Sequence, residues 1–145
     1  MERDELIETQ KKAMYKWFEG FGKGDVPLAY SGFDEDATWL GIGPGFTRVL
    51  YEGRQAIVDY QSAWVHDVWT GEMHYTILNV LADGNVVIAE WEDEAVSRTG
   101  EPYTNRGVHV FEFDGGPTVR RGRMYVDFEP LMRHISTFET SREAS

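Results

Sequence analysis

Residues 72–128, EMHYTILNVLADGNVVIAEWEDEAVSRTGEPYTNRGVHVFEFDGGPTVRRGRMYVDF, decide the fold of this chain. The segment divides into stretches of strand-like residues that are separated by tight, glycine-containing turns. Such turns favour β-hairpins, because short hairpin loops require positive φ angles that glycine adopts readily. We therefore predict four consecutive antiparallel strands, at Glu72–Leu81, Asn85–Arg98, Tyr103–Asp114 and Pro117–Phe128, joined at Asp83-Gly84, Gly100-Glu101-Pro102 and Gly115-Gly116.

The turns also predict a register between these strands. A two-residue loop at Asp83-Gly84 pairs Ala82 with Asn85 and sets His74 opposite Asp93. A loop at Gly100–Pro102 sets Asp93 opposite His109, and a loop at Gly115-Gly116 sets His109 opposite Gly122. Side chains alternate between faces, so His74, Asp93 and His109 are expected in one row on one face. A β-bulge in any hairpin would break this alignment.

The second predicted strand indicates which face is internal. Glu90, Glu92 and Glu94 form one face and belong in water. The other face, which therefore belongs inside, carries Asp93 as its single carboxylate and otherwise consists of Val87, Ala89, Trp91 and Ala95.

The first half of the chain supplies the helices that cover this face. Residues 4–22 and 54–67 have apolar residues at helical spacing, and Val26–Ser31 is expected to form a short helix. Short strands are expected at Asp36–Ile42 and Phe46–Tyr51, a last helical turn at Pro130–Ile135, and a loose tail at residues 136–145. This order predicts an α+β fold, a cystatin-like cone of N-terminal helices packed on a strongly bent antiparallel sheet, which forms one domain over residues 1–145 and encloses a cavity.

Composition narrows the class of protein. The chain has 145 residues, of which 41% are hydrophobic, and this is enough for one domain with a real core. A net charge of -11 argues against nucleic acid or an anionic membrane as partner, and the absence of cysteine excludes thiolate chemistry. The charged N-terminus is unlike a signal peptide, so we expect a cytoplasmic protein. No organic cofactor is implied, because Gly41-Ile-Gly43-Pro-Gly45 lacks a following helix.

Asp93, His109 and His74 are the candidate catalytic residues. A carboxylate on an inner face is costly unless it is paired, so Asp93 either makes a structural hydrogen bond or serves as an acid/base group. His109 is either a core histidine or, beside Asp93, an oriented imidazole with a raised pKa. A metal held by this His–Asp–His row is a further alternative. The candidate substrate-binding residues, which are otherwise core or cavity-mouth residues, are Trp17, Trp39, Trp91, Asn105, Phe111 and Met124.

The chain resembles the nuclear transport factor 2-like superfamily, specifically its SnoaL-like and ketosteroid-isomerase-like members. The resemblance covers most of the chain and implies the fold well but the chemistry poorly, because this fold hosts isomerases, cyclases, dehydratases, epoxide hydrolases and binders. It rests on Gly24-Asp25, Phe33-x-x-Asp36-Ala37-Thr38, Tyr51-Glu52-Gly53-Arg54-x-Ala56-Ile57, Tyr103-x-Asn105, Val110-Phe111-x-Phe113-Asp114-Gly115 and Arg123-x-Tyr125-x-Asp127.

The known catalytic sets of these families are incomplete here. In comparison with ketosteroid isomerase, Gly41 stands at the general-base Asp, Trp17 at the oxyanion-hole Tyr and His109 at the protonated Asp. The Asp-Arg-Asp trio of limonene epoxide hydrolase falls on Asp93, Trp91 and Met124, of which only Asp93 matches. His74 is similar to the His of scytalone-dehydratase-like enzymes, but Gly22 stands where its partner Asp would be.

The resemblance and the residues together predict a SnoaL-like enzyme. It would carry out acid/base proton transfer, of isomerase, cyclase, dehydratase or hydrolase type, on a hydrophobic, oxygenated small molecule in the cavity. A hydrophobic-ligand-binding protein without turnover and a simple assembly module are the alternatives. The resemblance, together with Arg120, Arg121 and Arg123 on the last strand, also predicts a homodimer formed through the sheet.

Overall fold

The computed structural model describes residues 2–43, 46–70, 73–127, 129–131 and 133–134. The predicted tail, residues 136–145, lies outside the described residues. The helices are α1 (Arg3–Gly22), α2 (Val26–Ala29) and α3 (Arg54–Val68). The strands are β1 (Phe33–Gly43), β2 (Phe46–Glu52), β3 (His74–Ala82), β4 (Val86–Val96), β5 (Pro102–Phe113) and β6 (Val119–Val126). Residues 129–131 and 133–134 are also helical.

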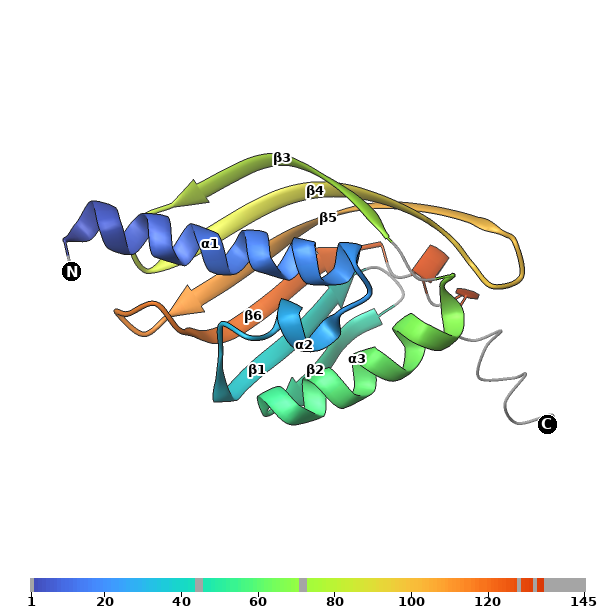
Figure 1. Ribbon diagram of the computed structural model, residues 1–145, viewed down its shortest axis with the longest axis horizontal. Coiled ribbons are helices and arrows are strands. Elements are labelled where there is room, and N and C mark those ends of the chain that lie inside the picture. The colour runs from blue at the N-terminus through green and yellow to red at the C-terminus, as the bar shows by residue number, and fades with distance from the viewer. Residues whose placement is uncertain (1, 44–45, 71–72, 128, 132, 135–145) are drawn as a thin grey trace.

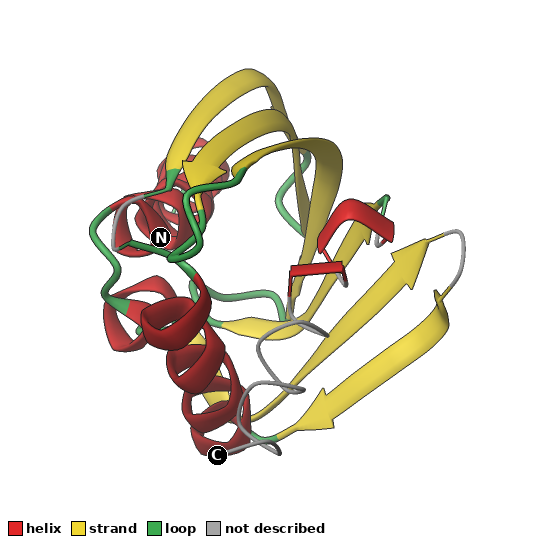
Figure 2. Ribbon diagram, turned by 90° about the vertical axis from the view of Figure 1, so that its right-hand side faces the viewer, coloured by secondary structure: helices red, strands yellow, loops and turns green. Residues whose placement is uncertain are grey.

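The described strands form one six-stranded sheet in the order β2-β1-β6-β5-β4-β3. The three predicted hairpin connections are present, so β3, β4, β5 and β6 are antiparallel neighbours. β1 lies parallel to β6, a pairing that hairpin signals could not reveal because the two strands are far apart in the sequence. The sheet curls strongly, and the helices lie on its concave side (Figures 1 and 2), as the predicted α+β cone requires.

Helix α1 covers β3 and β4, whereas α3 covers β1 and β2. The buried side of α1 carries Met14, Trp17, Phe18 and Phe21. Gln10 is also buried there, and its Nε2 donates to the carbonyl oxygens of Gly84 and Gly116 at 3.0 and 2.9 Å. These bonds tie the helix to two turns of the sheet. Within the described residues, no helix is long and apolar enough to span a lipid bilayer.

Aromatic rings fill much of the space between the helices and the sheet. Trp17 is central to this cluster, since its ring centroid lies 4.2 Å from that of Phe21, 5.8 Å from that of Trp39 and 4.1 Å from that of His109. All four side chains are buried. Because aromatic side chains bury large areas, this cluster carries much of the hydrophobic stabilisation.

Strand β4 confirms the predicted division between faces. Val87, Ala89, Trp91, Asp93 and Ala95 are all buried, whereas Ile88, Glu90 and Glu94 on the alternate face are exposed. Asp93 therefore points toward the concave interior, where burying a carboxyl group is costly.

Candidate active site

A small internal cavity lies between the helices and the concave face of the sheet. Its volume of about 40 Å³ is enough for roughly three water molecules. The predicted cavity is thus present, but the tryptophan side chains leave little of it empty. Its lining consists of Trp17, Phe21, Trp39, Gln61, Met73, Tyr75, Trp91, Asp93, Tyr103, Met124, Val126 and Leu131.

Asp93 is the one carboxyl group among the residues that line this cavity. Its side chain is only 6% exposed, and its Oδ1 has no hydrogen-bond partner within the described part of the chain. Burial raises the pKa of this carboxyl from 3.8 to about 7, against an opposing effect of the Asn105 backbone amide. Both protonation states of Asp93 are therefore accessible near neutral pH, as acid/base chemistry requires.

Two phenol groups accompany Asp93 at the cavity. Tyr75 lies opposite Asp93 on the neighbouring strand, and Tyr103 belongs to β5. Burial, and next the negative charge of Asp93, raises the pKa of both phenols above 10. Both hydroxyl groups thus stay protonated at neutral pH and can donate hydrogen bonds.

The hydrogen bonds of Tyr103 and Gln61 fix two sides of the lining. The Nδ2 group of Asn105 donates to Tyr103 Oη at 2.9 Å and to the backbone oxygen of Asp127 at 2.8 Å. On the other side, Tyr30 Oη donates to Gln61 Oε1 at 2.6 Å, which joins the segment after α2 to α3.

The predicted position of His74 is wrong. Asp83 accepts hydrogen bonds from the amides of Asn85 and Val86, so the turn is longer than two residues and Ala82 pairs with Val87. This pairing differs from the predicted register by two residues, and an irregularity between Ile77 and Asn79 then reverses one of them, which leaves a net shift of one residue. Because a shift of one exchanges the faces of a strand, His74 lies opposite Glu94 on the exposed outer face. Tyr75 takes its place beside Asp93.

The predicted hydrogen bond between His109 and Asp93 is also wrong. The loop between β4 and β5 sets Asn105 opposite Asp93, whereas His109 lies opposite Ala89 and, on β6, opposite Met124 rather than Gly122. His109 Nδ1 instead accepts a 2.7 Å hydrogen bond from Trp91 Nε1. Complete burial lowers the pKa of His109 to about 3. The raised pKa predicted for His109 beside Asp93 is therefore wrong. His109 is therefore neutral at physiological pH and does not line the cavity.

The structure distributes the predicted substrate-binding residues over three places. Trp17, Trp39, Trp91 and Met124 line the cavity, and Phe111 is fully buried in the surrounding core. Asn105 lies opposite Asp93 and lines an adjoining surface pocket instead of the cavity. Sequence reasoning gave no site role to Gln61, Tyr75 or Leu131, which also line the cavity. Tyr75 could have been found from the sequence, because it is the neighbour of His74 and a bulge was an open alternative.

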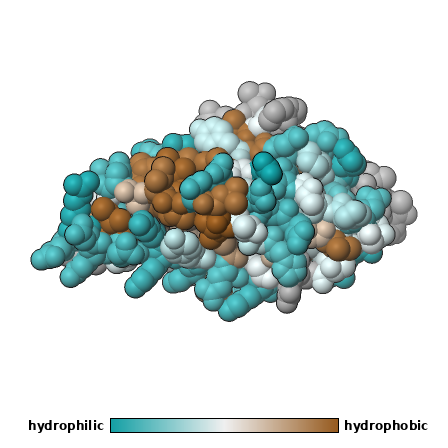
Figure 3. Space-filling view, turned by 90° about the horizontal axis from the view of Figure 1, so that it is seen from above, coloured by the Kyte–Doolittle hydropathy of each residue, from teal (hydrophilic) through white to brown (hydrophobic). Residues whose placement is uncertain are grey.

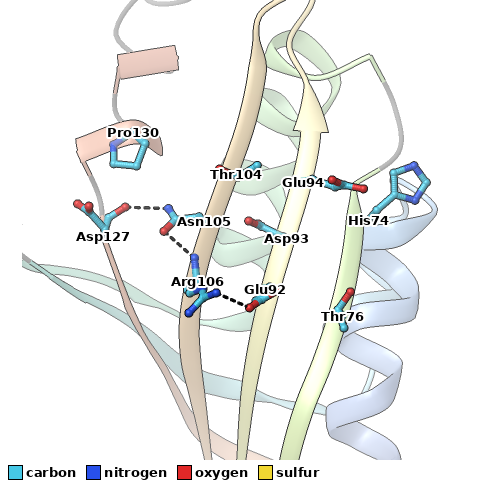
Figure 4. A pocket seen from close by; sticks show the side chains of 10 residues that line it. All are labelled: His74, Thr76, Glu92, Asp93, Glu94, Thr104, Asn105, Arg106, Asp127 and Pro130. Carbon is cyan, nitrogen blue, oxygen red and sulfur yellow. Dashed lines mark hydrogen bonds and ion pairs between the residues drawn. The ribbon is translucent and has the colours of Figure 1, made fainter.

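A wide surface pocket of about 600 Å³ adjoins this site (Figure 4). It opens on the outer face of β3, β4 and β5, and Asp93 lines both this pocket and the internal cavity. The remaining lining residues are His74, Thr76, Glu92, Glu94, Thr104, Asn105, Arg106, Asp127 and Pro130.

The arrangement on which a metal alternative rested does not form. His74 lies on the outer face, and His109 is bonded to Trp91. Within the described ranges, no group of three or more His, Cys, Asp and Glu side chains is placed to hold a metal ion.

Comparison with solved structures supports the fold over nearly the whole chain. A proposed isomerase from Bacillus subtilis is 23% identical, with 94% of this chain and 96% of that chain covered and a TM-score of 0.72. A nuclear transport factor 2-like protein from Anabaena variabilis is 19% identical, with 88% and 92% covered and a TM-score of 0.72. TerC, co-crystallised with polyporic acid, is 21% identical, with 88% and 98% covered and a TM-score of 0.71.

These structural likenesses, all below 25% identity, establish the fold alone. Among curated proteins, none matches the sequence significantly. The profile of the SnoaL-like domain matches residues 14–121, which is more than half of the chain. This protein therefore belongs to the SnoaL-like family.

Proposed function

We propose that this protein is an enzyme that uses Asp93 to transfer protons on a hydrophobic, oxygenated small molecule. The observation that carries the proposal is the Asp93 carboxyl, which is buried, has an unpartnered oxygen and lines an aromatic cavity. Its pKa of about 7 lets it take a proton from a substrate and return it at neutral pH. The reaction class is isomerisation, cyclisation, dehydration or hydrolysis.

The neighbouring side chains have complementary roles in this proposal. Tyr75 and Tyr103 donate hydrogen bonds to an oxygen of the substrate, where negative charge develops as a proton is removed. Trp17 and Trp39 pack against its apolar part. Since the cavity of about 40 Å³ is smaller than a ring compound, binding requires side chains to move. Met73 and Met124 in the lining suit this, because methionine side chains adapt readily.

Two of the structural relatives are consistent with small-molecule chemistry. One is named as a proposed isomerase, and the other was co-crystallised with polyporic acid. The alternative function is ligand binding without turnover. It is favoured by the positions of His74 and His109, neither of which lines the cavity that Asp93 faces.

The proposal is tested by proton exchange in a hydrophobic ring ketone. We would measure deuterium incorporation next to the carbonyl of 2-tetralone in D₂O by NMR, with the wild-type protein and with Asp93→Asn. We expect the wild type to accelerate exchange and Asp93→Asn to lose about 10²–10⁴ of the rate, the usual contribution of one acid/base group. His66→Ala is the control and should keep the rate, because His66 is exposed on α3 and lines neither the cavity nor the surface pocket.

The outcomes separate the two functions. Equal exchange by Asp93→Asn and the wild type would show that Asp93 does not transfer the proton. Binding of 2-tetralone by the wild type without accelerated exchange would favour the binding protein.

We also propose that two copies of this chain associate through the outer face of the sheet. Hydrophobic residues gather on this face over β3, β4 and β5, as the left half of Figure 3 shows. Leu81 is 67% exposed and Ile88 is 37% exposed, and such a continuous apolar surface favours association. Cross-strand pairing also aligns one row of residues across all six strands. From β3 to β2, this row consists of Leu81, Ile88, Val110, Arg123, Leu40 and Leu50.

A further inference from the structure

The internal cavity and the surface pocket meet at a single side chain. Asp93 is the only residue that lines both of them among the residues the structure describes. Figure 4 shows its carboxylate directed from β4 toward Asn105 of β5, at the edge of the surface pocket. A molecule seated in this pocket would therefore lie next to the proposed acid/base group.

The rim of the surface pocket is predominantly acidic. Glu92, Glu94 and Asp127 line it, together with one strongly basic side chain, Arg106. Arg106 is already paired, because its Nη2 lies 2.8 Å from Glu92 Oε1. Within the described ranges, Glu94 makes no ion pair, so its charge remains available to a ligand.

A cluster of acidic residues at a surface is usually only a hydrated face, but Asp93 distinguishes this one. Only 6% of the surface of Asp93 is exposed to solvent, yet its Oδ1 has no hydrogen-bond partner in the described part of the chain. An unsatisfied buried carboxyl oxygen is costly, so it indicates a missing hydrogen-bond donor. A protonated amine provides such donors together with the charge that the rim attracts.

The surroundings of Asn105 indicate how the two spaces are separated. Asn105 Nδ2 bonds both Tyr103 on the cavity side and the backbone of Asp127 on the pocket side. β5 and β6 pair as far as Gly107 and Val126, so the bond from Asn105 to Asp127 holds the strand ends together beyond the ladder, whereas the bond to Tyr103 lies within β5. Separation of these bonds would connect the pocket to the cavity without breaking strand pairing.

We infer that the surface pocket is the entrance to the Asp93 site and that it selects substrates with an ammonium group over anionic ones. This inference rests on the proposed function for the identity of the site, and it adds the charge of the substrate and its route. The net charge of -11 acts in the same direction, since it repels anions before they reach the pocket.

The test compares three compounds that share a phenyl ring and differ in charge: phenethylamine, 2-phenylethanol and 3-phenylpropionate. Binding to the full-length protein is measured by NMR titration at pH 8 and low salt. We expect phenethylamine to bind most tightly, 2-phenylethanol more weakly and 3-phenylpropionate not at all. The affinity for phenethylamine should fall with added salt, because the rim charges are exposed to solvent.

Glu94→Gln and Glu90→Gln form a matched pair of variants. Both change one exposed glutamate on the same face of β4, but Glu90 lies outside the pocket, roughly 13 Å along the strand. Glu94→Gln should weaken phenethylamine binding about three- to tenfold, as expected for loss of one nearby surface charge. The two variants are compared at physiological salt, where the screening length is about 8 Å and shorter than this distance, so Glu90→Gln should change the affinity less than twofold.

Several results would overturn the inference. They are absence of phenethylamine binding, equal binding of 3-phenylpropionate, or an equal effect of the two variants. These results are independent of the proton-exchange experiment with Asp93→Asn. If exchange depends on Asp93 but the charge preference is absent, the proposed function stands and the inference about the entrance fails.

Discussion

The indole nitrogen of Trp91 donates a 2.7 Å hydrogen bond to Nδ1 of His109, and this bond joins β4 to β5 inside the core. A nitrogen that accepts a hydrogen bond carries no proton, so the neutral imidazole holds its proton on Nε2. Nε2 has no hydrogen-bond partner among the described residues, and the ring packs edge-on against Trp17 at 4.1 Å. His109 therefore positions the aromatic wall of the cavity and does not serve as its base.

A double-mutant cycle on Trp91→Phe and His109→Phe tests this relationship by urea unfolding. Each single variant leaves one buried polar group unpaired and should lose about 1–3 kcal/mol in addition to the packing loss. The double variant removes both groups, so its loss should be smaller than the sum of the single losses by about 1 kcal/mol or more. A second cycle with Trp39 in place of Trp91 is a suitable control. The ring centroid of Trp39 lies 5.4 Å from that of His109, but Trp39 makes no hydrogen bond to His109. Additive losses at Trp91 and His109 would contradict a stabilising role for the bond.

Gly107→Ala should destabilise the protein through Trp91. The two residues are cross-strand partners, and a Cβ atom at Gly107 would lie 2.5 Å from Trp91 Cζ2 and 2.7 Å from the Tyr125 backbone oxygen. Overpacking of this kind costs about 1–3 kcal/mol, measurable as a lower midpoint of thermal or urea unfolding. Gly116→Ala is the control, because a Cβ there meets no atom within 4 Å. Similar stability of the two variants would show that the indole can move aside freely.

Asp93→Asn should stabilise the protein at pH 8 but not at pH 3.5. The pKa of Asp93 is raised from 3.8 to about 7, so between these values the folded state holds a proton that the unfolded state has lost. The stability of the wild type therefore falls as pH rises through this window, by roughly 4 kcal/mol for a shift of this size. Asparagine cannot ionise and avoids this loss, which unfolding of both proteins across the pH range would reveal.

Asp83→Asn provides a control of opposite sign. The backbone amides of Asn85 and Val86 donate to Asp83 and lower the pKa of its carboxyl below 3.8. Its stabilising effect is present above pH 3.8 and disappears as pH falls through the lowered value, so Asp83→Asn should be less stable than the wild type at pH 8. If Asp93→Asn also proves less stable at pH 8, the carboxyl is ionised and well solvated there.

Ile88→Lys should convert the proposed dimer to monomers. The variant introduces a charge between Leu81 and Val110 on the outer face, where burial of an unpaired ammonium is costly. Analytical ultracentrifugation at micromolar concentration measures the change in mass. Tyr15→Lys is the control, because Tyr15 is 47% exposed on α1 and lies away from that face. A monomeric wild type would contradict the proposal directly.

The hairpins and the faces of the strands could be predicted because they depend on local sequence. Glycine at turns and the side-chain period of two are properties of neighbouring residues, so Asp93 and His109 were correctly assigned to the interior. The predicted register between β4 and β5 was wrong by an even number of residues, and a shift of this kind leaves each side chain on the same face of its strand. Asp93 lies opposite Asn105 instead of His109, which is four residues along the strand.

The contents of the site were decided by the tertiary structure. The Asp83 turn and the irregularity near Leu78 shift β3 by an odd number of residues, which places Tyr75 rather than His74 beside Asp93. Side chains from distant segments then fill the cone and set the burial of each group. Burial raises the pKa of Asp93 and lowers that of His109, because desolvation disfavours whichever form of a group is charged. Sequence alone identified the ionisable residues of the interior, whereas only packing determined their neighbours and their charge.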